Sequence, residues 1–171
     1  MFFFKITLLK ELTLLNRQIK NMAQKNIFIS HIHEDDDGLQ KTKNLVKDKG
    51  FNIRDFSISA NKPNNAKAED YIKYQILAPR IRQCSVLMVY ITPQTKNSYW
   101  VNWEIEYAQK QGIRIVGVWA HGHQGCDIPE QLEDAADSIV GWNSNNLVKA
   151  ITGTPTFENY NAPHVSRYLC G

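Results

Sequence analysis

The sequence predicts an α/β protein in which five parallel strands form one sheet between two layers of helices. Five short apolar segments of strand character alternate along the chain with amphipathic segments of helical period. The segment at residues 86–91 (VLMVYI) is continuously apolar, as expected for a strand that is covered on both faces. A chain of 171 residues with 43% hydrophobic and 22% charged residues fits one globular domain. Together these observations indicate a three-layer, doubly wound fold.

The first half of the chain supplies two strands and one helix. Residues 25–30 (KNIFIS) form the first expected strand. An acidic loop then leads into a helix over residues 39–49, which we expect Gly50 to terminate because glycine commonly follows the last helical turn. Residues 51–56 alternate in polarity and form the second expected strand, and residues 57–66 form a polar loop.

A second helix is expected over residues 67–83. Pro79 should kink or divide it, because proline removes a backbone donor and clashes with the preceding turn. The core residues that we expect from this helix are Tyr71, Tyr74, Ile76, Leu77 and Ile81.

The second half repeats the alternation from the third strand at residues 86–91 onward. A polar loop and an amphipathic helix follow that strand and extend to about Gly112. The remaining expected elements are a strand at residues 113–118, a short helix at 128–134, a short strand at 138–140 and a helix at 143–151.

We expect the strands to lie in the flavodoxin-like order 2-1-3-4-5, in which the direction of winding reverses between the first and third strands. Ligands in such sheets bind outside the carboxyl ends of the strands at that switch point. The first strand ends at Ser30 and His31, with His33 in the following loop, and the helix after the third strand carries Glu104. The topology therefore predicts that these four residues converge on one crevice.

Glu104 is unusual for its position on the helical wheel. Val101, Ile105 and Ala108 form an apolar stripe, and Glu104 lies on the flank of that stripe, whereas Glu106 points to the opposite side. Wheel geometry alone also allows an ordinary boundary glutamate with a solvated carboxylate. Trp100 lies on the crevice side of the same helix and could stack on a base or a nicotinamide ring.

Charge and cysteine content narrow the classes of partner. The net charge is only +3, and the densest basic group, within residues 41–49, has the spacing of a solvated helix face. We therefore expect no nucleic-acid partner. The three cysteines are odd in number and far apart, which indicates a reducing compartment and a cytoplasmic protein.

The two ends of the chain are expected to lie outside the domain, which we assign to residues 25–152. Residues 1–24 are apolar in part, but Lys5, Lys10 and Glu11 interrupt the run well short of a membrane span. We interpret them as a peripheral extension, with an amphipathic helix at residues 6–20, or as an artefact of an upstream start, with Met22 as the natural one. Residues 153–171 have little pattern and form a tail that docking would order.

A metal-dependent hydrolase is an alternative reading of the histidines. His31 and His33 alternate on an extended segment with Asp35 nearby, and His121, His123 and Cys126 could add ligands. The matching metallo-hydrolase motif would require a histidine at Asp36, and its fold does not alternate β and α. We therefore expect no metal. No glycine-rich phosphate loop and no nucleophile elbow is present.

Two segments resemble TIR domains. Residues 28–31 (FISH) followed by Glu34, Asp35 and Asp36 resemble their opening strand and loop. Residues 98–105 (SYWVNWEI) resemble their Trp-x-x-x-Glu motif, in which the glutamate is catalytic in the members that consume NAD. Residues 126–129 (CDIP) and 140–143 (VGWN) are similar to the TIR-like proteins of bacterial Thoeris anti-phage systems.

The resemblance implies cleavage of the nicotinamide–ribose bond of NAD and release of an ADP-ribose-derived signal, cyclic or conjugated, that activates a partner effector. By position in the motif, Glu104 would be the catalytic residue. Ser30, His31 and Phe56 would line the substrate pocket, and Trp100 would flank it. His33, which the topology brings to the same crevice, is a further expected substrate-binding residue. NAD would be a substrate, with no cofactor required.

The resemblance also implies a phage-derived trigger and a possible homo-oligomer, with no membrane involved. A different class of function is compatible with the same residues: a TIR-like module that binds protein partners and does not catalyse a reaction.

Overall fold

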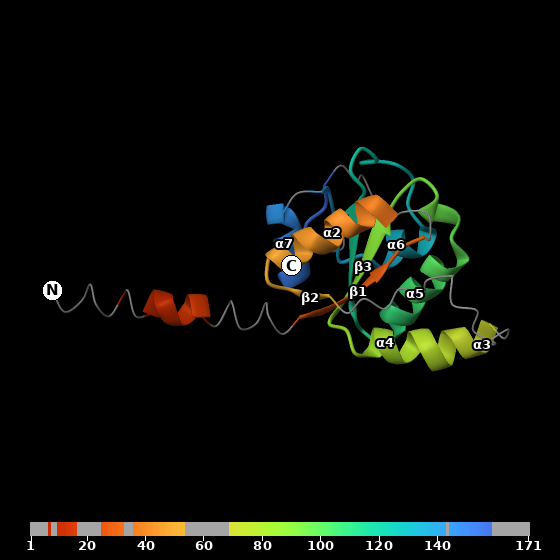
Figure 1. Cartoon of the computed structure of the whole chain (residues 1–171), viewed down its shortest axis with the longest axis horizontal. Helices are drawn as coiled ribbons and strands as arrows, with labels where there is room; N and C mark the ends of the chain where they lie inside the picture. The colour runs from red at the N-terminus through yellow and green to blue at the C-terminus, as the bar shows by residue number, and fades with distance from the viewer. Residues whose placement is uncertain are drawn as a thin grey trace.

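The computed structural model describes residues 7, 10–16, 25–32, 36–53, 69–142 and 144–158. One five-stranded sheet runs through it in the order β2-β1-β3-β4-β5, and every adjacent pair of strands is parallel. The predicted fold class and strand order are therefore confirmed (Figure 1). The strands are β1 (Asn26–Ser30), β2 (Asn52–Ile53), β3 (Val86–Ile91), β4 (Arg114–Trp119) and β5 (Ser138–Val140).

Helices cover both faces of the sheet. The α-helices are α2 (Asp36–Asp48), α3 (Glu69–Tyr71), α4 (Ala78–Arg82), α5 (Tyr99–Lys110), α6 (Glu130–Ala135) and α7 (Ser144–Thr152). A π-helix, η1 (Ile72–Leu77), joins α3 to α4, and a 3₁₀ turn, η2 (Thr95–Asn97), precedes α5. The second predicted strand extends to residue 56, but residues 54–60 lie outside the described residues.

Two apolar cores lie on opposite faces of the sheet. One contains residues of α4, α5 and α6 together with Phe28 and Val89, and the other contains residues of α2 and α7 together with Ile29 and Tyr90. Because side chains alternate along a strand, neighbouring residues of β1 and of β3 enter different cores. The arrangement of the helices in Figure 1 agrees with this three-layer division.

The caps of two helices explain where they begin and end. Gly50 follows α2 with φ +85° and donates its amide to the carbonyl of Lys47 at 2.8 Å, as the predicted glycine terminator requires. Ser98 precedes α5, and its hydroxyl accepts the Val101 amide at 3.4 Å. The start of α5, which carries Glu104, is therefore positioned by its own sequence.

The helix predicted at residues 67–83 differs from expectation because its central part is a π-helix. Residues 69–82 are helical, but η1 occupies the centre, with the Ala78 amide bonded to the Lys73 carbonyl five residues earlier. A π-turn widens the helix where the Pro79 ring would otherwise collide with the preceding turn. The wider turn also rotates the preceding residues, so an α-helical wheel misplaces them.

The prediction that Tyr71 and Tyr74 are core residues is consequently wrong. Their exposed fractions are 52% and 55%, whereas Lys73 between them is 9% exposed. Lys73 packs against α5, where its Nζ bonds to the Tyr99 hydroxyl and lies 5.8 Å from the Trp103 ring centroid, whereas both tyrosines are exposed. Leu77 and Ile81 are buried as predicted, and Ile76 is half-buried.

The first residues of the tail dock on the sheet. The Ile139 amide donates to the Thr156 carbonyl at 2.9 Å, and the Glu158 amide donates to the Ile139 carbonyl at 2.8 Å. The Glu158 carboxylate also accepts the Gly141 amide at 2.5 Å. Residues 156–158 therefore cover the outer edge of β5.

Candidate active site

Glu104 lies on the buried face of α5. Its exposed fraction is 7%, and its helix neighbours Val101, Ile105 and Ala108 are each 0% exposed. The sequence pattern placed Glu104 at the boundary of the apolar stripe, and the structure brings its carboxyl group inside. A buried carboxyl group requires a polar partner or a proton. Burial of the charged group without a partner is unfavourable by roughly several kcal/mol.

Ser30 is that partner. It is the last residue of β1 and 1% exposed, and its hydroxyl donates to Glu104 Oε2 at 2.5 Å. Because Ser30 and Phe28 alternate with Ile29, both face the core formed by α5. The contact spans 74 positions of sequence and joins the end of β1 to α5 beside β3. The residues meet at the switch point between β1 and β3, where the topology predicts a crevice.

The electrostatic state of Glu104 follows from this setting. Burial raises the pKa of its carboxyl group from 4.5 to about 8, and the hydrogen bond from Ser30 opposes that rise by favouring the charged form. Near neutral pH the Glu104 carboxyl group is therefore largely protonated. A cation placed beside it would favour the carboxylate.

The other predicted pocket residues have different positions. His31 is half-buried directly after β1, with Nδ1 3.2 Å from the Ile29 carbonyl oxygen. Trp100 lies one turn before Glu104, is 36% exposed, and packs edge-to-face against Tyr99 with ring centroids 5.6 Å apart. His33 and Phe56, and the loop at residues 57–66, lie outside the described residues.

Sequence reasoning missed a polar cluster that supports the start of α5. Lys73 Nζ bonds to Glu69 Oε1 at 2.5 Å and also bonds to the Tyr99 hydroxyl. The Tyr99 hydroxyl also donates to the Glu69 carboxylate. The Lys73–Glu69 bond, followed by the bonds that each makes with Tyr99, raises the pKa of Lys73 and lowers the pKa of Glu69. Lys73 Nζ also lies 4.6 Å from the Tyr99 ring centroid, a cation–π distance. The i, i+4 spacing of Glu69 and Lys73 in the sequence indicates their ion pair. No sequence pattern indicates that Tyr99 joins them.

The hypothesis of a metal-dependent hydrolase requires a set of ligands that lie close together. Within the described ranges, no three His, Cys, Asp or Glu side chains come together in a way that could hold a metal ion. Asp35 and His33 are outside those ranges.

None of the helices in the described part of the chain is long and apolar enough to cross a membrane.

Comparison with known families identifies one similarity. A family model described as "Thoeris protein ThsB, TIR-like domain" matches residues 28–125. The match begins at Phe28 within β1, includes Ser30, Trp100 and Glu104, and ends just before residues 126–129. No curated protein matches the chain at a significant level. The matched segment covers more than half of the 171 residues and contains the Ser30–Glu104 contact.

Proposed function

Because the chain belongs to the TIR-like domain family of Thoeris protein ThsB, we propose that it is an enzyme that cleaves NAD at the bond between nicotinamide and ribose. The observation that carries this proposal is a single buried carboxyl group, Glu104, bonded to Ser30 at the carboxyl edge of a doubly wound sheet. The chemistry of this bond requires one carboxylate.

Nicotinamide is a favourable leaving group in NAD. The nicotinamide ring of NAD is cationic and departs as a neutral molecule when the carbon–nitrogen bond breaks, so no general acid is needed. The electron pair of that bond stays with nicotinamide, and positive charge develops on the ribose, as in glycoside hydrolysis. A carboxylate fixed beside the ribose stabilises that charge.

Glu104 would supply this carboxylate once substrate is bound. The cationic substrate favours the ionised form of the buried carboxyl group, so binding would displace its proton. Ser30 would hold the carboxylate in orientation through its 2.5 Å hydrogen bond, and Trp100, His31, His33 and Phe56 remain proposed pocket residues.

Attack by a nucleophile on the ribosyl cation would complete the reaction. Attack by water on the ribosyl cation gives ADP-ribose and one proton, and attack by a group of the ADP-ribose itself or of another molecule gives a cyclic or conjugated product. We propose that such a product is the signal of an anti-phage response, that it acts on a downstream effector, and that a phage-derived trigger starts its synthesis. Assembly of several copies would fit this regulation.

The experiment compares two glutamates of one helix in phage-infected cells. Glu106 is exposed on the opposite side of α5 and pairs with Lys110 at 2.6 Å, so Glu106→Gln is the matched control for Glu104→Gln. After infection, mass spectrometry should detect nicotinamide and an ADP-ribose-derived product in wild-type and Glu106→Gln cells and neither above background in Glu104→Gln cells.

The same experiment tests the alternative of a non-catalytic interaction module. Protection against phage by Glu104→Gln at the wild-type level, with no product formed by any variant, would support the interaction module and reject the enzyme. Product formation by Glu104→Gln at the wild-type rate would reject the assignment of Glu104 alone.

A further inference from the structure

A second concave site lies on the other face of the sheet. A cleft of about 470 Å³ opens at the carboxyl edge between α2 and the ends of β3, β4 and β5. Its lining includes Tyr90, whose ring belongs to the core formed with α2 and α7. Clefts of 300–1,000 Å³, roughly, are the usual size for small-molecule sites.

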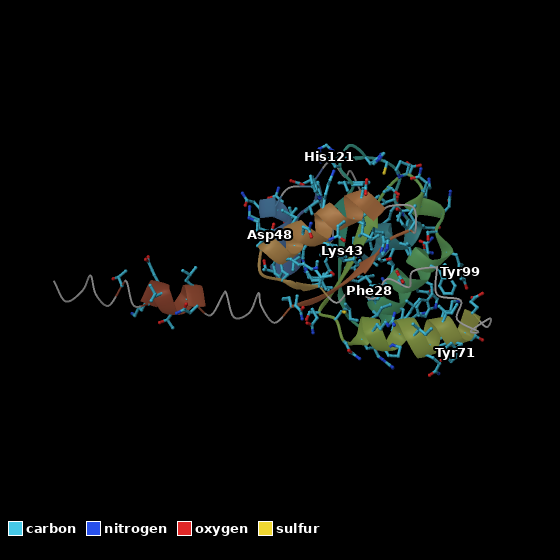
Figure 2. All side chains as sticks on the ribbon, viewed as in Figure 1. Phe28, Lys43, Asp48, Tyr71, Tyr99 and His121 are labelled. Atoms are coloured by element: carbon cyan, nitrogen blue, oxygen red, sulfur yellow. The ribbon has the colours of Figure 1, made fainter. Side chains whose placement is uncertain are left out.

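This cleft is distinct from the Glu104 site. Ser30 pairs with Val89, and Tyr90 is the next residue of β3, so Val89 and Tyr90 face opposite sides of the sheet. Val89 enters the core with α5, and Tyr90 enters the core with α2. Figure 2 shows His121, which lines the cleft, at a position well separated from Tyr99 near the start of α5.

One wall of the cleft is aromatic and held in place. Trp142 is half-buried, and its Nε1 donates to Thr42 Oγ1 at 3.1 Å, while Thr42 Oγ1 donates to the Gly38 carbonyl at 3.0 Å. His121 packs edge-to-face against Trp142 with ring centroids 5.3 Å apart. Because the indole nitrogen is already bonded, Trp142 offers a ligand its aromatic surface rather than a donor.

The wall formed by α2 is charged. Asp37 and Lys41 are exposed, lie one helical turn apart and line the cleft. Within the part of the chain that the structure describes, neither side chain makes a hydrogen bond or an ion pair with another residue. An ammonium group suits a phosphate, and a carboxylate suits the paired hydroxyls of a ribose.

The first turn of α2 comes close to the floor of the cleft. A side chain at Gly38 would collide with the Tyr90 hydroxyl oxygen, so only glycine allows this approach. Backbone amides in the first turn of this 13-residue helix, which contains Asp37 and Gly38, add a partial positive charge to this wall of the cleft.

We propose that this cleft binds a nucleotide, with the base against Trp142 and His121, the ribose hydroxyls on Asp37 and the phosphate on Lys41. Inorganic phosphate would leave the aromatic wall unused, and an uncharged nucleoside would leave Lys41 unused. The proposal stands independently of NAD cleavage at Glu104, because the two sites share none of their side chains.

Calorimetric titration of the full chain with AMP tests the proposal, and adenosine serves as the phosphate-free comparison. Lys41→Ala should weaken AMP binding about tenfold and leave adenosine binding unchanged, because a charged hydrogen bond to phosphate is lost. Lys47→Ala is the matched control, since Lys47 is exposed near the far end of α2, and it should bind AMP as wild type does. Trp142→Phe should keep AMP binding within a few-fold, and Trp142→Ala should weaken binding of both ligands about tenfold or more.

Three results would overturn the proposal. The first is the absence of AMP binding to wild type at millimolar concentration, and the second is equal AMP affinity in wild type and Lys41→Ala. The third is a loss of AMP binding in Glu104→Gln while Lys41→Ala binds AMP as wild type does, which would assign AMP to the Glu104 site. Since Lys41 is exposed, its variant keeps the test valid even when Trp142→Ala fails to fold.

Discussion

At the scale of single residues, the proposed activity depends on one carboxyl group whose protonation is set by its surroundings. Glu104 is buried among aliphatic side chains and bonded to Ser30, so its pKa is raised to about 8. A raised pKa lowers the stability of the folded protein at high pH. It also allows the carboxyl group to ionise when a cation binds beside it. Both consequences can be measured.

The pH dependence of stability should change in Glu104→Gln. Between pH of about 4.5 and 8, the native state keeps a proton on Glu104 that the unfolded chain releases, so the free energy of unfolding of wild type falls as pH rises. The fall from this group is up to about 1.4 kcal/mol per pH unit. Glu104→Gln has no such group, so it should become progressively more stable than wild type as pH rises through that window.

Urea unfolding at several pH values across the window measures this difference. Glu106→Gln, on the exposed face of the same helix, should follow wild type at every pH. A constant difference between Glu104→Gln and wild type would mean that Glu104 is already ionised at the low end of the window.

Ser30→Ala should move the pH profile of NAD cleavage. The hydrogen bond from Ser30 favours the ionised carboxyl group, so its removal raises the pKa of Glu104 further. Because the carboxylate is the active form, kcat/KM of wild type should rise with pH through about 8, and the midpoint in Ser30→Ala should lie at a higher pH. Ser85→Ala, exposed at the opposite end of the sheet, should keep the wild-type midpoint. An unchanged midpoint in Ser30→Ala would separate Ser30 from the ionisation of Glu104.

At the scale of elements, the sequence pattern predicted the regular strands and helices but not the π-helix η1. Continuous apolar runs such as residues 86–91 identify buried strands without ambiguity, and β3 has those bounds. The π-turn of η1 was not predictable, because a helical wheel assumes one constant angle per residue. Tyr71 and Tyr74, which were expected in the core, are exposed instead, and Figure 2 shows Tyr71 on the outside of the molecule.

The packing of α6 on the sheet should depend on Gly117 in β4. An added Cβ there would lie 2.9 Å from Ile91 Cδ1 and 3.2 Å from Leu132 Cδ2. Gly117→Ala should therefore lower the free energy of unfolding by about 1–3 kcal/mol, measured by chemical denaturation.

Ile91→Val provides a specific rescue, since it removes the one atom closest to the added Cβ. In a double-mutant cycle, Gly117→Ala should be less destabilising in the Ile91→Val background than in wild type. Strict additivity of the two changes would contradict overpacking as the cause.

At the scale of the whole molecule, the alternation of strands and helices predicted one long-range contact of the site, between Ser30 and Glu104. The order 2-1-3-4-5 brings Ser30 beside Glu104 across 74 positions, which no local pattern could show. The cleft beside Trp142 was not predicted, because its walls come from α2 and the ends of three strands, and only the tertiary structure joins them. The roles of His31, His33, Phe56 and Trp100 in substrate binding remain predictions.

The start of the tail should contribute to the stability of the whole domain. A chain that ends at residue 155 loses the two backbone hydrogen bonds between residues 156–158 and Ile139, and it should be less stable by about 2 kcal/mol. A chain that ends at residue 158 keeps both bonds and is the matched control. Equal thermal midpoints for the two chains would mean that residues 156–158 do not stabilise the edge of β5.

Release of nicotinamide from NAD by protein purified from phage-infected cells tests the central claim most directly. At the same protein and NAD concentrations, Glu104→Gln should release nicotinamide about a hundredfold or more slowly than wild type, because the charge that stabilises the ribosyl cation is gone. Glu106→Gln should match wild type within about twofold, since surface changes of this kind have small effects. Wild-type rates in Glu104→Gln, or no nicotinamide from wild type itself, would contradict the account.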